Sequence, residues 1–395
     1  MLAINGGTPI RDKFLPYGKQ VIDENDIKSV VNILNGDYLT TGPAVSEFEK
    51  KVADYVGSKY AVAVSNGTAA LHIACLSADI KEGDEVITTP MTFAASANCI
   101  LYCGAKPVFV DIDKETYNID VNEIEKKITP ETKAIIPVHF TGQSVDLDPI
   151  LELAKKYNLT VIEDAAHALG TKYKGRFIGS ISDMTEFSFH PVKTVTTAEG
   201  GIITTNRKDL YEKLILFRTH GITRNTEFME NKNEGPWYYE QIDLGYNYRI
   251  TDLQCALGIT QMDKLDGFIK RRKELVGMYN EYLSKIDGVI IQKEGEFSDT
   301  SRHLYIMKLD LDKFKVGRKE IFEALLAENI GVNVHYLPVY LHPYYKKLGY
   351  EKGLCPNSEE LYDSMITLPL YPGMSNDDFY DVINAVNKVL GYYRK

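Results

Sequence analysis

The chain has few of the features that mark membrane, secreted and nucleic-acid-binding proteins. Its 395 residues carry more acidic than basic side chains, for a formal net charge of −10. This charge disfavours a nucleic-acid partner, which usually meets a basic face. No apolar run reaches the roughly 18 residues of a membrane-spanning helix, and the first residues lack a signal-peptide pattern. We therefore expect neither nucleic acid nor a membrane as a partner.

Cysteine is also scarce. The five cysteines are an odd number and have no paired metal-ligand spacing: Cys75, Cys99, Cys103, Cys255 and Cys355. A secreted disulfide framework would normally use more cysteines in even number, and a zinc site would pair them closely. The count predicts reduced thiols, a cytoplasmic chain and no metal site.

Short runs rich in valine and isoleucine alternate with helical patterns over the first part of the chain. The runs lie at residues 60–65, 85–89, 107–111, 134–139 and 160–163, and the helical patterns include 68–78, 93–103 and 148–157. Continuous apolar runs suit strands buried on both faces. The alternation therefore predicts an α/β fold with a mostly parallel sheet.

A long helical pattern at residues 251–286 separates this region from a different one. Beyond it, residues 300–395 mix strand patterns (303–309, 331–336) with helical ones (318–329, 376–390). The chain is long enough for two domains. We predict a large domain at residues 1–262, including an N-terminal arm, and a small α+β domain at residues 263–395.

Ligands of open α/β sheets lie beyond the carboxyl ends of the strands, where two polar stretches fall. In S-N-G-T-A-A, Gly67 and Thr68 begin a helix whose free N–H groups suit a phosphate, although a simple strand–turn–helix gives the same pattern. In V-I-E-D-A-A-H, Asp164 ends an apolar strand. An unpaired carboxylate is costly there, so Asp164 is either held by a cationic partner or used as a cap or salt bridge.

Two further stretches are also candidates for contact with a ligand. In E-F-S-F-H-P-V-K, Ser188 is placed to donate to a phosphate and Lys193 follows in a loop, where a plain surface lysine is the alternative. Phe93 follows a strand and is placed either to cover a flat ring or to pack in the core. Together the four stretches suit pyridoxal 5′-phosphate: Lys193 would bond its aldehyde, and Asp164 would keep its ring nitrogen protonated.

The motifs T-T-G-P, S-N-G-T-A-A-L, E-D-A-A-H-A-L-G, S-F-H-P-V-K and G-Y-N-Y-R-I-T-D occur in this order. With them, nearly the whole chain resembles the DegT/DnrJ/EryC1/StrS sugar aminotransferases, which have the fold type I of pyridoxal-phosphate enzymes. The resemblance implies that Lys193 bonds the cofactor and Asp164 holds its nitrogen. The other implied cofactor contacts are Phe93 on the ring, His167 near the ring hydroxyl, Gly67, Thr68 and Ser188 on the phosphate, and Asn247 on the phosphate in a neighbouring subunit. A homodimer with shared active sites follows.

Three stretches, including P-W-Y-Y-E-Q-I-D-L-G-Y-N-Y-R, are similar to the family branch that serves pseudaminic acid biosynthesis. This similarity implies amino transfer from L-glutamate to C4 of a UDP-linked 4-keto-6-deoxy-N-acetyl-hexose. We expect substrate contacts from His335, Tyr336 and Tyr340, with packing in the small domain as the alternative.

Three other functions stay open. The first is amino transfer to another nucleotide-sugar, at C3 or C4. The second is sugar 3-dehydration, which Lys193 disfavours because the related dehydratases carry histidine at that position. The third is a regulatory protein that keeps the cofactor but turns over no sugar.

Overall fold

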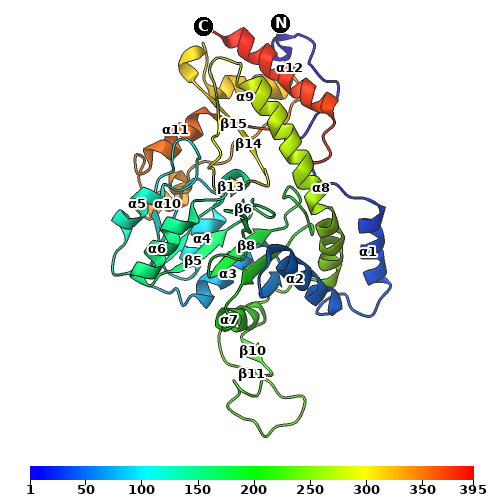
Figure 1. Cartoon of the computed structure of the whole chain (residues 1–395), viewed down its shortest axis with the longest axis vertical. Coiled ribbons are helices and arrows are strands. Elements are labelled where there is room, and N and C mark those ends of the chain that lie inside the picture. The colour runs from blue at the N-terminus through cyan, green and yellow to red at the C-terminus, as the bar shows by residue number, and fades with distance from the viewer.

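A seven-stranded sheet forms the centre of the larger body in the computed structural model, which describes residues 1–395 (Figure 1). The strand order is β1 (Tyr60–Val64), β9 (Gly201–Thr205), β8 (Met184–Ser188), β5 (Thr160–Asp164), β4 (Thr132–Ile136), β2 (Glu85–Thr88) and β3 (Lys106–Phe109). Only β9 runs antiparallel to its neighbours. The expected α/β fold with a mostly parallel sheet is confirmed.

Helices cover both faces of this sheet, which explains the unbroken apolar strands. Alternate residues of β1 enter different clusters: Ala61 and Ala63 pack with one group of helices, and Val62 and Val64 with another. The first group is α2 (Pro43–Val56) and the start of α8 (Asp252–Leu283); the second is α3 (Gly67–Ser77), α4 (Ala95–Tyr102) and α7 (Lys208–Arg218). A strand buried on both faces needs no polar alternation.

The smaller body is built on a three-stranded antiparallel sheet. Its order is β12 (Val289–Ile291), β14 (Tyr305–Leu309) and β15 (Met365–Leu368), and α9 (Arg318–Ala327), α12 (Asn376–Tyr393) and the second half of α8 pack with it. Leu2 and Leu15 belong to the same core. The start of the chain thus packs with the smaller body, and its assignment to the large domain does not match this packing.

Helix α8 connects the two bodies without a break (Figure 1). Its buried residues up to Ile269 pack in the core of the large body, and those from Leu275 pack in the core of the small one. We therefore propose a boundary between these two residues, later than the expected residue 262. The buried positions keep a heptad-like spacing through α8, and the apolar pattern is interrupted between the two halves by the basic run at residues 270–273, in which Arg272 is buried.

The remaining elements are short or peripheral. They are α1 (Glu24–Leu34), α5 (Val121–Ile124), α6 (Leu147–Tyr157), α10 (Pro343–Lys347), α11 (Pro356–Ser364), β6 (Lys172–Tyr173), β7 (Arg176–Phe177), β10 (Ile222–Thr223), β11 (Glu240–Gln241), β13 (Ser298–Asp299) and five 3₁₀ turns. Strands β10 and β11 carry a hairpin that projects from the large body (Figure 1). Residues 331–336, predicted as a strand, form only an isolated bridge from Asn333 to Thr367.

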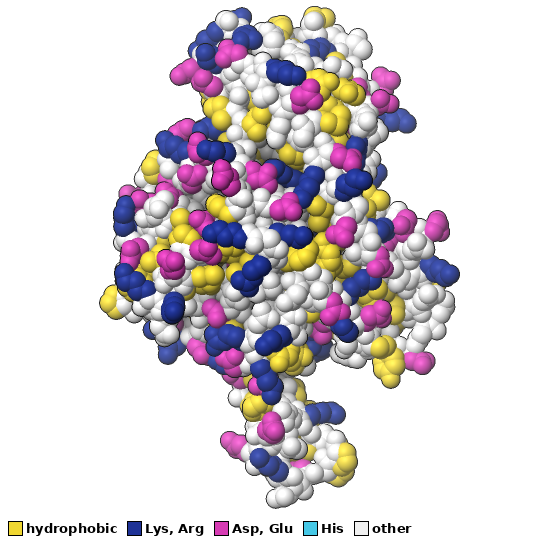
Figure 2. Space-filling view, viewed as in Figure 1, with side chains coloured by type: hydrophobic (Ala, Val, Ile, Leu, Met, Phe, Trp, Pro, Cys, Tyr) yellow, Lys and Arg dark blue, Asp and Glu magenta, His cyan; other side chains and the backbone are white.

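Charge is dispersed on the face that Figure 2 presents. Acidic and basic side chains are interspersed there, without one broad basic area. Separately, none of the helices combines the length and the apolar character needed to cross a bilayer.

Candidate active site

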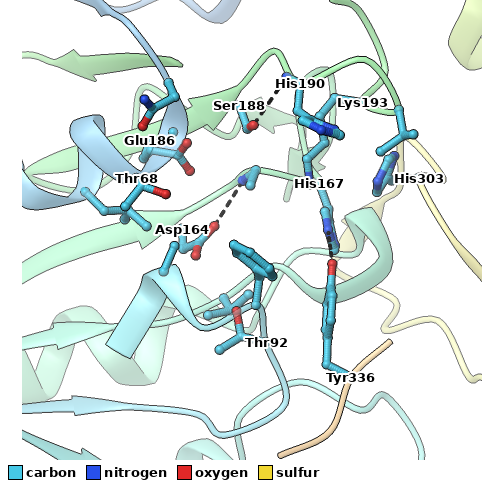
Figure 3. Close-up of a pocket in the computed structure, with 18 of the residues that line it drawn as sticks. Thr68, Thr92, Asp164, His167, Glu186, Ser188, His190, Lys193, His303 and Tyr336 are labelled. Atoms are coloured by element: carbon cyan, nitrogen blue, oxygen red, sulfur yellow. Dashed lines mark hydrogen bonds between the residues drawn. The ribbon is translucent and has the colours of Figure 1, made fainter. Parts of the chain in front are cut away.

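A cavity of about 860 Å³ opens at the carboxyl ends of β5 and β8. Its walls come from the large body, through β5, β8 and the start of α3, and from the segment 333–336 of the small body. Seven sequence-predicted cofactor residues line it: Gly67, Thr68, Phe93, Asp164, His167, Ser188 and Lys193 (Figure 3). The fold thus brings together side chains that lie more than a hundred residues apart.

Asp164 is the last residue of β5, and it is 5% exposed. Its carboxylate accepts hydrogen bonds from Ser96 Oγ at 2.5 Å and from the Ala166 backbone N–H at 3.2 Å. Ser96 is itself held by Thr92 Oγ1 at 2.6 Å. No cation pairs with Asp164 within salt-bridge distance, so its charge is available to a bound group. A protonated pyridine nitrogen is such a group.

Lys193 lies in the loop after β8, and its backbone N–H donates to the His190 carbonyl. Burial by the cavity walls lowers the pKa of its amine to about 8, although Asp164 and Glu186 act in the opposite direction. About a tenth of Lys193 is therefore unprotonated at pH 7, far more than of an ordinary solvated lysine. An unprotonated amine is what bonding to an aldehyde and proton transfer both require.

The first turn of α3 provides a seat for a phosphate. Asn66 caps the helix through a 2.8 Å hydrogen bond from the Ala69 N–H, and the N–H groups of Gly67 and Thr68, two residues that line the cavity, have no partner in the chain. Ser188 lines the same part of the cavity as Thr68 (Figure 3). Free N–H groups at a helix N-terminus bind anions well. The donor set fits the phosphate of pyridoxal 5′-phosphate.

Two glycines permit this close arrangement. A Cβ on Gly201 would lie 2.5 Å from the Asn66 carbonyl oxygen, so only glycine lets β9 pass beneath the turn. A Cβ on Gly67 would lie 2.4 Å from Glu186 Oε1 and 3.3 Å from Ser188 Oγ. The turn and the side chains of β8 are therefore in contact below the phosphate seat.

Phe93 is a large apolar side chain that is 62% exposed at the cavity wall. Its ring centroid lies 6.2 Å from that of Tyr336. Exposed aromatic rings on a cavity wall suit a flat partner, so the position fits stacking on a pyridine ring. The alternative of a core aromatic does not match the exposure.

A group of histidines forms the side of the cavity nearest Lys193. His167 Nε2 lies 3.2 Å from Tyr336 Oη, and its ring centroid lies 4.5 Å from that of His303. His335 contacts Thr367 Oγ1 through Nδ1 at 2.9 Å. Burial lowers the pKa of His335 to about 3 and holds the pKa values of His167 and His303 well below the ordinary value, with Lys193 adding repulsion. These histidines are neutral at pH 7.

The buried histidines predict a pH-dependent stability for the cofactor-free protein. A histidine whose folded pKa lies below its unfolded value stabilises the fold above about pH 6.5 and loses that contribution as pH falls. Between pH 7 and 5.5 each of the three should lower the free energy of unfolding by about 1.3 kcal/mol. Urea unfolding at several pH values measures this loss.

His303→Gln should make that pH dependence shallower, because it removes one of the three groups. His220→Asn is the matched control, since His220 is exposed and lies outside the cavity. An unchanged slope in His303→Gln would contradict the interpretation.

Two sequence-predicted residues do not line the cavity. Tyr340 is fully buried, and its hydroxyl donates to Glu359 at 2.5 Å; its ring packs in an aromatic cluster that includes Phe109 of β3 in the large body. The expected substrate contact by Tyr340 therefore does not match the structure, and the packing alternative does. Asn247 is exposed, and its backbone forms a bridge with Thr219, away from the cavity of its own chain.

Sequence patterns do not predict Ser96, which bonds Asp164 from outside the cavity lining, nor Glu186 and His303, which line the cavity. Ser96 follows Phe93 by three residues, and its spacing of one helical turn from Thr92 could have indicated it. Glu186 has the same strand parity as Ser188, so both side chains leave β8 on the same face. His303 comes from the small body, and nothing near it in sequence signals a site.

The family membership rests on a match over most of the chain. The model of the DegT/DnrJ/EryC1/StrS aminotransferase family matches residues 20–387. The chain belongs to this family. It is therefore a pyridoxal-phosphate-dependent sugar aminotransferase, and the fit of the cavity to that cofactor agrees with the assignment.

Relatives match over nearly their whole lengths. The uncharacterized protein MJ1066 of Methanocaldococcus jannaschii is 47% identical, over 98% of this chain and 100% of its own. The spore coat polysaccharide biosynthesis protein SpsC of Bacillus subtilis is 45% identical, over 96% and 98%. The UDP-4-amino-4,6-dideoxy-N-acetyl-beta-L-altrosamine transaminase of Campylobacter jejuni is 40% identical, over 96% and 99%.

Solved structures of sugar aminotransferases share the fold. Helicobacter pylori PseC, an aminotransferase involved in the biosynthesis of pseudoaminic acid, superposes with a TM-score of 0.90 at 30% identity, over 96% of this chain and 100% of its own. The pyridoxal-phosphate form of the putative sugar aminotransferase Spr1654 from Streptococcus pneumoniae gives 0.87 at 32% identity, over 96% and 99%. The predicted fold type I and the predicted cofactor are both confirmed.

Proposed function

We propose that this aminotransferase moves the amino group of L-glutamate to C4 of a UDP-linked 4-keto-6-deoxy-N-acetyl-hexose, in pseudaminic acid biosynthesis. The observation that carries the proposal is the 40% identity to the altrosamine transaminase of Campylobacter jejuni over 384 residues. The fold of H. pylori PseC, with a TM-score of 0.90, supports it. A cytoplasmic location stays a prediction from the cysteine count.

The cavity supports an uncharged sugar as the amino acceptor. Lys193, Asp164 and Glu186 are buried ionisable groups of the cavity, whereas the neutral His167, His303 and His335 and the phenol of Tyr336 lie beside Lys193 toward the small body. Neutral imidazoles and a phenol offer both donors and acceptors to sugar hydroxyls. We therefore propose that His335 and Tyr336 contact the substrate, whereas Tyr340 lies outside the cavity.

Lys193 is proposed to move the proton in each half of the reaction. Pyridoxal 5′-phosphate, when bound, supplies an amino-group carrier and an electron sink. The amine of Lys193, with a pKa of about 8, is suited to accept a proton from a substrate carbon and to return it near neutral pH. Asp164, oriented by Ser96 and the Ala166 N–H, is proposed to keep the ring nitrogen protonated.

A second acceptor is favoured by the 45% identity to SpsC, a protein of spore coat polysaccharide biosynthesis. That relative is closer in sequence than the altrosamine transaminase. The alternative function is amino transfer to another nucleotide-sugar, and the regulatory alternative predicts no transfer at all.

One substrate screen separates these functions. The holoenzyme is given ¹⁵N-labelled L-glutamate and a panel of 4-keto-6-deoxy sugars linked to UDP, dTDP or GDP, with and without the N-acetyl group. Nitrogen NMR identifies the aminated carbon, and a UDP-sugar without the ketone is the control. We expect ¹⁵N at C4 of the UDP-linked N-acetyl sugar. Label on a different sugar would support the second acceptor, and no label on any sugar would support the regulatory alternative.

We also propose a homodimer in which Asn247 completes the phosphate site of the partner. Asn247 is exposed and does not line the cavity of its own chain, although the next residue, Tyr248, does. The Asn247 side chain has no hydrogen-bond partner within its own chain. The neighbouring Tyr248, in contrast, contacts His72 through its hydroxyl. An isologous dimer would repeat any such contact in both subunits.

Mixing two inactive variants tests the shared site. Lys193→Ala disables its own site, and Asn247→Asp places a negative charge beside the partner's phosphate. A heterodimer then has one site with both changes and one with neither, so re-equilibrated mixtures should regain about half the normal activity per heterodimer. Subunit exchange is verified with differently tagged chains. If exchange occurs without recovery and Asn247→Asp alone is inactive, Asn247 acts within its own subunit.

A further inference from the structure

Glu186 is a buried acidic side chain to which the established chemistry gives no role. It is the third residue of β8 and only 1% exposed. Neither of its carboxyl oxygens has a hydrogen-bond partner. A buried carboxylate without a hydrogen-bond donor is among the costliest groups a fold holds, so a bound proton or a partner outside the protein is expected.

The sheet register directs Glu186 into the cavity. Glu186 lies opposite Asp164 on the parallel strand β5, and registered residues of neighbouring strands leave the sheet on the same face. Ser188 follows two positions later on that face. Figure 3 shows the Glu186 carboxyl between Thr68 and Ser188, on the phosphate side of Asp164.

Contact distances place this carboxyl against the phosphate seat. A Cβ built on Gly67 would come within 2.4 Å of Glu186 Oε1, which shows how closely the carboxyl lies under the first turn of α3. Ser188 Oγ lies 3.3 Å from the same point. An anion held by the N–H groups of this turn would therefore be the neighbour of Glu186.

The surroundings of Glu186 disfavour the ionised form of its carboxyl group. Burial raises its pKa well above the ordinary value, the charge of Asp164 and a hydrogen-bonding contact with that carboxyl raise it further, and Lys193 only partly opposes them. The other titratable group facing it is Cys99, on α4. A phosphate at the seat would add further negative charge. A neutral carboxylic acid, in contrast, has one O–H to donate.

We propose that Glu186 belongs to the phosphate seat and, as a protonated carboxylic acid, donates a hydrogen bond to the phosphate of the cofactor. The proposal rests on the cofactor position proposed above. It also explains how an acidic residue is tolerated beside an anion: the protonated acid donates to the phosphate in place of the neighbouring Asp164 carboxylate. Glu186 acts here in binding the phosphate, and the proton transfers of the reaction stay with Lys193.

Two substitutions at this position separate the neutral acid from a carboxylate. Glu186→Gln keeps a neutral donor of the same shape, so the dissociation constant of pyridoxal 5′-phosphate should stay within about threefold of the wild type. Glu186→Leu removes the donor, and it should weaken binding by about tenfold or more, the loss of one hydrogen bond to a charged group. Glu323→Leu, at an exposed glutamate on α9, is the matched control.

Pyridoxal, which lacks the phosphate, identifies the group that Glu186 contacts. Its dissociation constant should be the same in wild type and Glu186→Leu within about threefold, because the lost bond goes to the phosphate alone. Equal weakening of both ligands, unchanged binding of pyridoxal 5′-phosphate in Glu186→Leu, or a Glu186→Gln variant as weak as Glu186→Leu would each overturn the proposal.

A spectroscopic measurement keeps the proposal testable if Glu186→Leu fails to fold. The infrared difference spectrum between wild-type and Glu186→Gln holoenzymes should contain the carbonyl band of a protonated carboxylic acid. A carboxylate band in its place would overturn the proposal. Borohydride labelling of Lys193 in the same samples shows separately whether the cofactor occupies this cavity, so a failure of the site assignment is distinguishable from a failure of the Glu186 proposal.

Discussion

Replacing Lys193 with alanine should lower the turnover number of amino transfer by about a thousandfold or more. The change removes both the amine that bonds the cofactor's aldehyde and the group that moves the proton, and proton transfer alone contributes 10²- to 10⁴-fold. The amine also has the lowered pKa that the chemistry needs, about 8. Steady-state kinetics with glutamate and the accepted nucleotide-sugar measure the effect.

The matched control is Lys319→Ala, at a lysine on α9 whose side chain is 80% exposed. It should turn over at the wild-type rate. Thermal unfolding of the cofactor-free variants checks that both fold. A folded Lys193→Ala enzyme with more than a tenth of wild-type turnover would exclude Lys193 as the catalytic lysine.

Replacing Asp164 with asparagine should reduce turnover by roughly a hundredfold to a thousandfold, the usual loss on removing one fixed charge from a reacting centre. The neutral amide keeps the shape of the side chain and leaves the phosphate seat at Gly67, Thr68 and Ser188 intact. Cofactor affinity should therefore fall much less than turnover. Parallel measurement of the turnover number and the cofactor dissociation constant separates the two effects.

The turnover of Ser96→Ala can be compared with that of Asp164→Asn, and we expect the smaller loss in Ser96→Ala. Ser96 orients Asp164 through one hydrogen bond of 2.5 Å and carries no charge itself. Its replacement should cost about tenfold in turnover, the value of one oriented hydrogen bond. An Asp164→Asn enzyme with near-normal turnover, or one no slower than Ser96→Ala, would reject the role of Asp164.

Much of the cofactor side of the cavity was predictable because it follows from strand ends. Apolar runs mark β5 and the neighbouring parallel strands, and the rule that ligands lie at their carboxyl ends indicates the residues that follow. Asp164, Ser188 and the turn at Gly67 were found in this way, and the structure brings them to one cavity. Lys193 was found because a lone lysine beside small polar residues and paired glycines suits deprotonation.

The small-body side was harder to predict, because its residues reach the cavity only through the packing of the two bodies. His303 begins a segment with no motif of its own, and Tyr340 has the same local pattern as Tyr336 but points into an aromatic cluster. The segment 331–336 reads as a strand from its composition, yet it crosses the cavity with a single bridge. Contacts between parts of the chain that are distant in sequence determine the positions of His303, Tyr340 and the segment 331–336. Local sequence patterns carry no signal for such contacts.

Glu186 shows the same limit on the large body. Strand alternation places it on the same face as Ser188, but a glutamate in E-F-S-F reads equally well as a solvated strand residue. Only the burial of its carboxyl and the absence of a partner distinguish the two interpretations. Strand alternation thus predicts the face on which the Glu186 side chain lies. It does not predict whether that side chain is buried or has a partner.

Reduction of the holoenzyme with borohydride tests most directly whether this cavity is the active site. Borohydride fixes the cofactor to the lysine that bonds it, and peptide mapping by mass spectrometry then identifies that lysine. The cavity contains one lysine, so we expect label on Lys193 and its loss in Lys193→Ala. Label on any other lysine of the wild-type enzyme would contradict it.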